Sequence, residues 1–284
     1  MVSRGDFHCH STASDGILSP ADVVTLAYDE GVRVLALTDH DSTEGIAEAR
    51  AAVADKSDFT LIPGVEMGTD IPGGEVHVLG YFLEPGNAEL QTVLEKLRAS
   101  RKDRGRGMVE KLREMGFDVT WEQVQRFAGD GAVGRPHVAQ ALFEKGYVET
   151  VTEAFDKYIG RNGPAYVDRI KMTPRDAVAT IVRLGGVACL AHPADLEDLD
   201  GLLAGLKDAG LAGMEVHYKL YDEETVARLA AAAERHGLLP LGGSDYHGLY
   251  GEDEPYPGGM RSPVPDSSTD ALLARGRELA KQRA

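Results

Sequence analysis

Two histidines near the start of this chain have a spacing that can bind metal. His8 and His10 flank Cys9 in the sequence DFHCH, within a predicted strand over residues 6–10. Because strand side chains alternate between two faces, both imidazoles share one face and Cys9 points to the other. Such a pair can give one metal ion two ligands. The same pair could also be two polar residues on a solvated edge.

Further histidines and carboxylates recur along the chain, most of them where predicted strands end. His40 follows the apolar run RVLALT, Glu66 ends FTLIPGVE, and Asp245 and His247 follow LLPLGGS. Each alone could be a helix cap or a satisfied polar group in the core. Strand ends gather at one face of a parallel barrel, so their recurrence indicates a shared site. The nine candidate metal ligands are His8, His10, Asp15, His40, Glu66, His77, His192, Asp245 and His247.

The types of these side chains indicate which metals they suit. Imidazole nitrogens and carboxylate oxygens, without thiolates, favour zinc, manganese or iron over a structural thiolate zinc site. Nine ligands exceed the capacity of one ion, so we expect two or three. Neighbouring metals can activate a water molecule and bind the oxygens of a phosphoryl group. We predict Glu66 as a bridging carboxylate, and Asp15 or His247 as the residue that moves a proton.

The elements that must position these residues alternate between strand and helix, except in the middle of the chain. The predicted strands cover residues 6–10, 33–38, 59–66, 75–82, 186–191, 213–217 and 238–242. The helices predicted around them cover residues 20–30, 42–54, 174–184, 196–209, 223–236 and 269–282. Repeated strand–helix units favour a parallel sheet or barrel.

In the middle of the chain the strand pattern disappears. Amphipathic helices are predicted over residues 90–115, 121–127, 136–144 and 152–159. We therefore expect a barrel formed by residues 1–84 and 166–284, and an all-helical insertion formed by residues 85–165.

Composition limits the class of protein. The 284 residues carry a formal net charge of -16, which works against long-range attraction of nucleic acid. The sequence contains no apolar run long enough to span a bilayer and no secretory signal at its N-terminus, and two cysteines cannot build a disulfide framework. We expect a cytoplasmic protein without an obligate protein partner, and Cys9 and Cys189 are interpreted as packing residues.

The motifs DFHCHSTASDG, TDHD, GVE, HVLGY, AHP and GGSDYH together resemble the PHP (polymerase and histidinol phosphatase) metallophosphoesterases. The resemblance covers nearly the whole chain and implies a distorted (β/α)7 barrel with a binuclear or trinuclear metal site. It implies a first metal on His8, His10, Glu66 and Asp245. It also implies a second metal on Asp15, His40 and His247, and a third on Glu66, His77 and His192.

The helical insertion after HVLGY makes the chain most similar to the bacterial nucleoside 3′,5′-bisphosphate phosphatases, some of which are also 5′→3′ exoribonucleases. Residues 96–113 hold eight Lys and Arg against two acidic residues. Arg135 precedes a predicted helix start, where free backbone N–H groups favour an anion. A second phosphate on the substrate would need such a positive pocket. The predicted substrate-binding residues are Arg101, Arg104, Arg135, His137 and His217.

Alternatives remain for these residues. A basic helix is often a solvated face, and His137 could instead cap its helix. Asp39 could orient a ligand histidine or cap a helix.

The predicted function is hydrolysis of a phosphomonoester by a metal-bound hydroxide, with the 3′-phosphate of a nucleoside 3′,5′-bisphosphate as the expected target. Four alternatives stay open: an exonuclease acting on short RNA, a histidinol-phosphate phosphatase, a polymerase-associated proofreading domain, and a metal-stabilised nucleotide-binding protein without catalysis. The basic insertion disfavours the second. The third is disfavoured because no polymerase follows, and the fourth because none of the nine ligands is missing.

Overall fold

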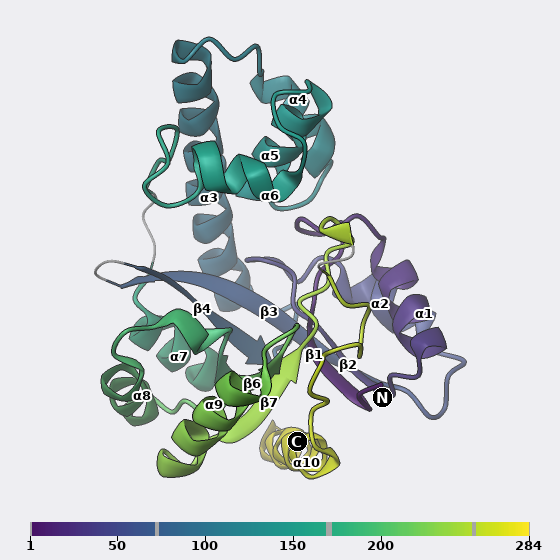
Figure 1. The fold of residues 1–284 in the computed structure, drawn as a ribbon. Helices are drawn as coiled ribbons and strands as arrows, with labels where there is room; N and C mark the ends of the chain where they lie inside the picture. The colour runs from purple at the N-terminus through teal and green to yellow at the C-terminus, as the bar shows by residue number, and fades with distance from the viewer. Residues whose placement is uncertain (1, 72–73, 169–171, 252–253, 284) are drawn as a thin grey trace.

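A seven-stranded sheet, curved into a nearly closed barrel, forms the centre of the protein (Figure 1). The computed structural model describes residues 2–71, 74–168, 172–251 and 254–283. The strands are β1 (Gly5–Cys9), β2 (Val34–Leu37), β3 (Thr60–Ile71), β4 (Gly74–Tyr81), β5 (Val187–Leu190), β6 (Gly213–Tyr218) and β7 (Leu239–Gly243). Each pairs with the next in chain order. A bridge from Cys9 to Tyr246 joins the two ends of the sheet, and the His10 N–H donates to the Tyr246 carbonyl at 2.9 Å. The predicted distorted (β/α)7 barrel is confirmed.

The sheet is mixed, which corrects the expectation of a parallel sheet. β4 is antiparallel to both β3 and β5, whereas the other neighbours in the sheet are parallel. β3 ends at Ile71 and β4 begins at Gly74, so the connection is too short for the crossover that parallel strands require. The sequence Pro72-Gly73-Gly74 predicts a turn at this connection, and Pro72 and Gly73 lie outside the described residues.

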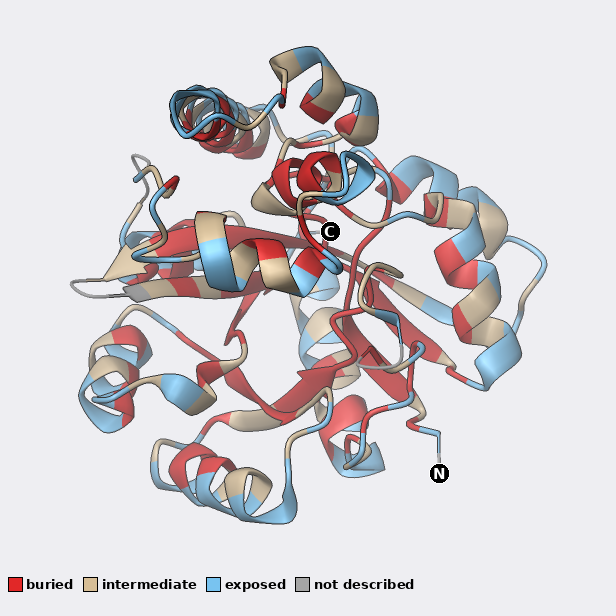
Figure 2. Cartoon of the chain, turned by 45° about the horizontal axis from the view of Figure 1, so that its top comes forward, coloured by how far each residue is buried: buried red, intermediate tan, exposed pale blue. Residues whose placement is uncertain are grey.

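Helices cover the outside of the barrel and leave their polar faces in solvent (Figure 2). They are α1 (Pro20–Glu30), α2 (Ile46–Ala52), α7 (Pro174–Arg183), α8 (Leu199–Asp208), α9 (Glu223–Arg235) and α10 (Asp266–Arg283), with a short 3-10 turn η2 (Pro193–Asp195). Every residue of β1, β2 and β5 is buried. Strands buried on both faces tend to be continuous apolar runs, as VLAL in β2 and VACL in β5 are, which is why the sequence identifies these two readily.

Two of these helices start later than the sequence predicts. α2 begins at Ile46 rather than at residue 42, and Asp41, just before the predicted start, has a left-handed backbone (φ 50°). α8 begins at Leu199 rather than at residue 196. Pro193–Asp195 forms the separate turn η2, and the Asp198 side chain caps α8 by accepting the Gly201 N–H.

Between β4 and α7 the described chain is helical apart from its connections. It forms α3 (Ala88–Glu114), α4 (Trp121–Ala128), α5 (Arg135–Glu144), α6 (Val151–Ala154) and a π-helical turn η1 (Phe155–Ile159). These helices pack around their own apolar cluster above one mouth of the barrel (Figure 1). The division at residues 85 and 165 remains an interpretation of the sequence.

The long helix α3 belongs to both apolar cores. Leu90, Leu94 and Leu97 in its first half pack in the main barrel cluster, whereas Met108 and Leu112 in its second half pack in the cluster of the insertion. With about 1.5 Å of rise per residue, its 27 residues span roughly 40 Å. α3 therefore fixes the insertion against the mouth of the barrel. Among the described residues, none of the helices is long and apolar enough to cross a membrane.

Candidate metal centre

The candidate ligands come together at the mouth of the barrel beneath the insertion. A cavity there, the central cavity, is lined by Asp15, His40, Glu66, Glu75, His77, Arg101, Arg104, Arg135, Pro136, Phe155, His192, Asp245, His247 and Tyr250. His8 and His10 lie fully buried beside it. His77 is not at the carboxyl end of its strand. Because β4 runs antiparallel to its neighbours, its amino-terminal half reaches the same mouth as their carboxyl ends.

The first group of ligands consists of His8, His10, Glu66 and Asp245, whose ligand atoms all lie within 4.8 Å of one another. The Nε2 atoms of His8 and His10 lie 3.1 and 3.2 Å from Glu66 Oε2. The same two nitrogens lie 3.2 and 3.1 Å from Asp245 Oδ1. Two imidazole nitrogens and two carboxylate oxygens thus face one point, which is the set expected for the first metal.

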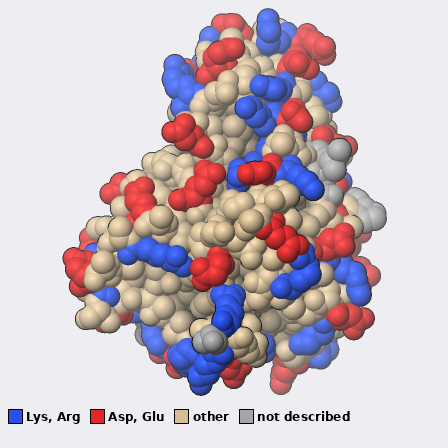
Figure 3. Space-filling model, turned by 180° about the vertical axis from the view of Figure 1, so that it is seen from behind, with Lys and Arg blue, Asp and Glu red and all other residues tan. Residues whose placement is uncertain are grey.

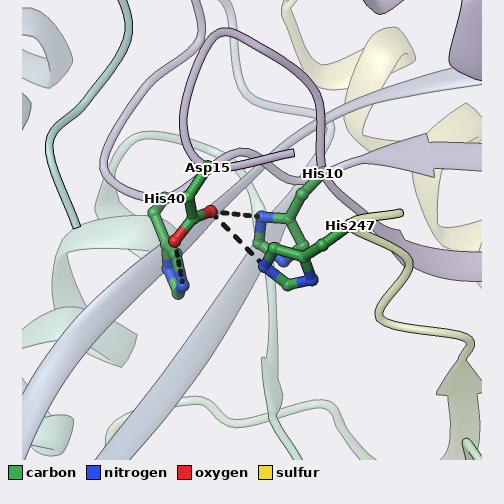
Figure 4. Close-up of side chains that lie close together, drawn as sticks. All are labelled: His10, Asp15, His40 and His247. Carbon is green, nitrogen blue, oxygen red and sulfur yellow. Dashed lines mark ion pairs between the residues drawn. The ribbon is translucent and has the colours of Figure 1, made fainter. Parts of the chain in front are cut away.

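The second group consists of His10, Asp15, His40 and His247 (Figure 4). The Asp15 carboxylate points between the rings, with Oδ1 3.4 Å from His247 Nε2 and Oδ2 3.8 Å from His40 Nε2. Oδ1 also lies 3.8 Å from His10 Nδ1. The expected second set is present, and His10 lies beside it as well as in the first group.

The third group consists of His40, Glu66 and His77. Glu66 Oε1 lies 2.6 Å from His77 Nδ1 and 3.4 Å from His192 Nε2, while Oε2 faces the first group and His40 Nδ1 at 3.0 Å. The two oxygens of Glu66 therefore point to different groups. This is the position that a bridging carboxylate requires.

Several buried polar atoms in these groups have no hydrogen-bond partner among the described residues. They are His8 Nε2, His10 Nε2, His40 Nδ1, Glu66 Oε2 and both Asp15 oxygens. Buried polar atoms are normally hydrogen-bonded, and each exception needs an explanation. Divalent cations would supply the missing partners, and the nitrogen and oxygen donors suit zinc, manganese or iron. The residues present therefore fit a metal centre.

Electrostatics keep the carboxylates of the centre ionised. Burial alone would raise the pKa of Glu66, but His40, His77 and His8 around it hold that pKa well below its ordinary value. The pKa of Asp15 is likewise lowered, because His40 and His247 outweigh its burial. Burial, reinforced by the nearby Arg101, lowers the pKa of His40 to about 4. Anionic carboxylates and a neutral imidazole are the forms that bind metal.

Asp245 is held by two neighbours that the sequence analysis missed. The Tyr218 hydroxyl donates to Asp245 Oδ2 at 2.7 Å, and Lys219 Nζ lies 2.9 Å from the same oxygen. With Oδ2 occupied, Oδ1 alone faces His8 and His10. Tyr218 is the last residue of β6 and Lys219 follows it. Both come directly after the strand predicted over residues 213–217, and that position was the one signal of their role in the sequence.

Asp39 acts on the centre through serines. Its carboxylate accepts the Ser11 N–H at 2.8 Å and the Ser14 hydroxyl at 2.6 Å, and Ser14 Oγ lies 3.4 Å from His10 Nδ1. It therefore fixes the loop after β1 and, through Ser14, the His10 ring. This arrangement resembles the orienting role considered for Asp39 more than a helix cap.

The insertion contributes three arginines to the central cavity. Arg101 Nε lies 2.5 Å from Asp41 Oδ2, and Arg101 Nη2 is buried with no hydrogen-bond partner among the described residues. Arg104 and Arg135 both pair with Glu75, at 3.5 and 2.8 Å. Glu75, which the sequence analysis also missed, thus links the arginines to His77, 3.5 Å away.

Two of the predicted substrate-binding residues, His137 and His217, do not line the central cavity. His137 caps α5, because its Nδ1 accepts the Gly134 N–H at 2.9 Å. His217 Nδ1 lies 2.9 Å from Ser262 Oγ, and neither histidine lines the central cavity. The pairing of β6 with β7 shifts register between Glu215 and His217, so Glu215, rather than His217, faces the metal ligands.

Comparison with known proteins identifies the family. A model described as the PHP domain matches residues 6–166. The chain belongs to the PHP family. The resemblance read from the motifs is therefore confirmed, and this PHP protein is a metal-dependent phosphoesterase, a hydrolase.

Relatives of this PHP protein match along most of their length. A 5′-3′ exoribonuclease of Haemophilus influenzae is 35% identical over 252 residues, covering 87% of this chain and 91% of that protein. A 3′,5′-nucleoside bisphosphate phosphatase of Chromobacterium violaceum is 33% identical over 247 residues, covering 85% of this chain and 86% of that protein. The solved structure of an amidohydrolase from Chromobacterium violaceum, with bound sulfate and no metal, matches with a TM-score of 0.87 at 32% identity. The match covers 96% of this chain and 97% of that chain.

Replacing His8 and His10 together by Ala should remove metal and activity from this PHP protein. The change deletes two of the four ligands of the first group and one of those around Asp15. We expect at least one fewer ion per chain by elemental analysis, and phosphoesterase activity at background. Unchanged metal content with full activity would contradict the ligand assignment.

Gly134→Ala should disturb the second group from the side of the insertion. A Cβ at Gly134 would lie 2.9 Å from Asp15 Oδ2 and must displace that carboxylate. We expect metal binding to weaken about tenfold, a typical effect of disturbing the residues around a metal ligand. Titration of the metal-free protein with Mn²⁺ measures this affinity. The matched control is Gly86→Ala, where a Cβ meets nothing within 4 Å. Equal affinity in the two variants would argue against contact between the insertion and the centre.

Proposed function

We propose that this protein hydrolyses a phosphomonoester, with the 3′-phosphate of a nucleoside 3′,5′-bisphosphate as its target. The observation that carries the proposal is the pairing, within one cavity, of the candidate metal ligands with three arginines from the insertion. The ligand groups would bind the phosphate that is cleaved, and the arginines would bind the other. Divalent ions held at such a site activate water and neutralise the charge on phosphoryl oxygens.

Two of the arginines, Arg101 and Arg104, suit a second phosphate because they are buried on the wall of the central cavity. Arg101 and Arg104 are 4% and 3% exposed, so an anion bound to them would be shielded from water. Arg101 Nη2 offers a donor with no partner among the described residues. Charge-assisted hydrogen bonds in such surroundings are shorter and stronger than neutral ones. The N-terminus of α5, which begins at Arg135 on the wall of the cavity, adds partial positive charge.

The residues of the chain have separate roles in this mechanism. Arg101, Arg104 and Arg135 would orient the substrate by its distal phosphate, so that the scissile phosphate would lie at the divalent ions that Glu66 and the histidines would hold. Fixing the reacting groups in place lowers the entropic part of the barrier. Asp15 or His247, both on the wall of the cavity, would move the proton of the attacking water. The group that protonates the departing alcohol is left unassigned.

A 5′→3′ exoribonuclease acting on short RNA is the second candidate, supported by the relative of that name in Haemophilus influenzae. The charge of -16 weighs against long polyanions, which bind mainly through Lys and Arg contacts to phosphates. The face seen in Figure 3 carries acidic and basic side chains interspersed. The basic residues of the central cavity are still compatible with a short RNA as substrate, because they would contact only the phosphates nearest to them. A small nucleotide is therefore the first choice.

Phosphate release should distinguish these substrates. With added Mn²⁺, we expect adenosine 3′,5′-bisphosphate to be hydrolysed to AMP with a kcat/KM roughly 10- to 100-fold above those of the 3′- and 5′-monophosphates. This is the effect of one added charge-assisted hydrogen-bonded contact of about 1.5–3 kcal/mol. The panel should include histidinol phosphate and a short 5′-phosphorylated RNA. Preference for either would replace the proposal by that activity, and binding of nucleotide without turnover would favour the non-catalytic alternative.

Arg135→Ala should separate binding of the second phosphate from chemistry. We expect kcat/KM for the bisphosphate to fall about 10- to 100-fold, whereas kcat/KM for the 3′-monophosphate changes little, because that substrate has no second phosphate. The control is Arg126→Ala, an arginine of the same insertion whose exposed side chain pairs with Glu144. Equal losses on both substrates would contradict a second phosphate pocket at Arg135.

A further inference from the structure

A buried carboxylate outside the three ligand groups contacts two of the histidines. Glu215 lies on β6, and its side chain is fully buried. Its Oε1 accepts a hydrogen bond from His8 Nδ1 at 3.1 Å, and its Oε2 accepts the backbone N–H of His192 at 2.8 Å. Both carboxylate oxygens are therefore used by histidines that face the centre.

The contact with His8 sets which nitrogen of that ring can bind metal. A carboxylate only accepts hydrogen bonds, so the proton of His8 is held on Nδ1. Nε2, the nitrogen that faces Glu66 and Asp245, is then the one left to bind metal once its own proton is lost. Histidine ligands commonly donate their second ring nitrogen in this way, which fixes the tautomer and the orientation of the ring.

The contact with His192 acts on the backbone. His192 has φ 30° and ψ 58°, a left-handed conformation that residues other than glycine adopt rarely and at a cost. The hydrogen bond from its N–H to Glu215 holds this turn. The turn places His192 Nε2 3.4 Å from Glu66 Oε1, and the His192 ring stacks against His8 with centroids 6.0 Å apart.

We propose that Glu215 is a positioning residue of the metal centre, which couples the first group, through the tautomer of His8, to His192 beside the third group. It lies outside the three ligand groups. The coupling follows from its two oxygens, each bound to one of the histidines. The proposal concerns metal binding alone, so it can fail or succeed whatever the substrate proves to be.

Glu215→Gln tests the proposal with little change of shape. An amide offers one acceptor and one NH2 donor, so it cannot accept from both histidines. If the NH2 faces His8, the ring must accept at Nδ1 and carry its proton on Nε2, which then cannot bind metal. If it faces His192, the strained turn loses its hydrogen bond. We expect Mn²⁺ binding to weaken about 10- to 100-fold, with at least one fewer ion per chain after dialysis against limiting Mn²⁺.

The control is Asp6→Asn, which alters another fully buried carboxylate of the barrel. Asp6 accepts the backbone N–H groups of His8, Ser244 and Gly258 but contacts none of the histidine rings in the described structure. Asp6→Asn should lower the melting temperature of the metal-free protein while keeping the wild-type number of Mn²⁺ ions, counted by elemental analysis and by electron paramagnetic resonance. Wild-type Mn²⁺ binding by Glu215→Gln, or the same loss of ions in both variants, would overturn the proposal.

A second measurement needs no variant. In wild-type protein loaded with Zn²⁺, nitrogen NMR should show His8 with its proton on Nδ1, and that proton should exchange slowly with water because Glu215 and His8 are fully buried. A His8 ring protonated on Nε2, or bound to Zn²⁺ through Nδ1, would overturn the proposal even if Glu215→Gln fails to fold.

Discussion

The carboxylate of Glu66 lies at the centre of the arrangement on which the rest of the structure depends. It is 1% exposed, and its two oxygens lie within 3.4 Å of nitrogens on five histidine rings. These rings come from β1, β4 and the segments after β1, β2 and β5. A buried carboxylate surrounded in this way is unfavourable unless every strand holds its ring in place, because an unpaired buried charge is costly. The curvature and mixed direction of the sheet satisfy that requirement, since they turn parts of distant strands towards a single residue.

The insertion is part of this centre rather than an addition to it. The segment before α5 passes so close to the loop after β1 that a Cβ at Gly131 would lie 2.4 Å from the Thr12 carbonyl oxygen. The Ala132 N–H also donates to the Ala13 carbonyl at 3.1 Å. Together with α3, which packs in both cores, these contacts bring arginines over ligands that the barrel alone presents. Charge of both signs is thus concentrated in one cavity of a strongly acidic protein.

The barrel, and the clustering of the candidate ligands at its mouth, could be predicted from the sequence because both leave local signals. Buried strands read as apolar runs, and a histidine or carboxylate directly after such a run stands out. Residues whose role depends on the paths of several strands left no such signal. Glu215 acts because a register shift separates it from His217, and Glu75 acts because β4 reverses direction. The substrate also cannot be read from local patterns, since relatives of similar sequence are named for different activities.

The closure of the barrel between β1 and the segment after β7 determines the order in which the centre forms during synthesis. His8 and His10 leave the ribosome first, but the first group also needs Asp245, which follows more than 230 residues later. A nascent chain that ends before β7 therefore has His8, His10 and Glu66 but lacks Asp245. It also lacks the segment that closes the barrel against β1. Contacts between residues so far apart form late and slowly, because the intervening chain must first be ordered. Stable binding of metal at the first group would therefore have to wait until Asp245 has been made, near the end of synthesis.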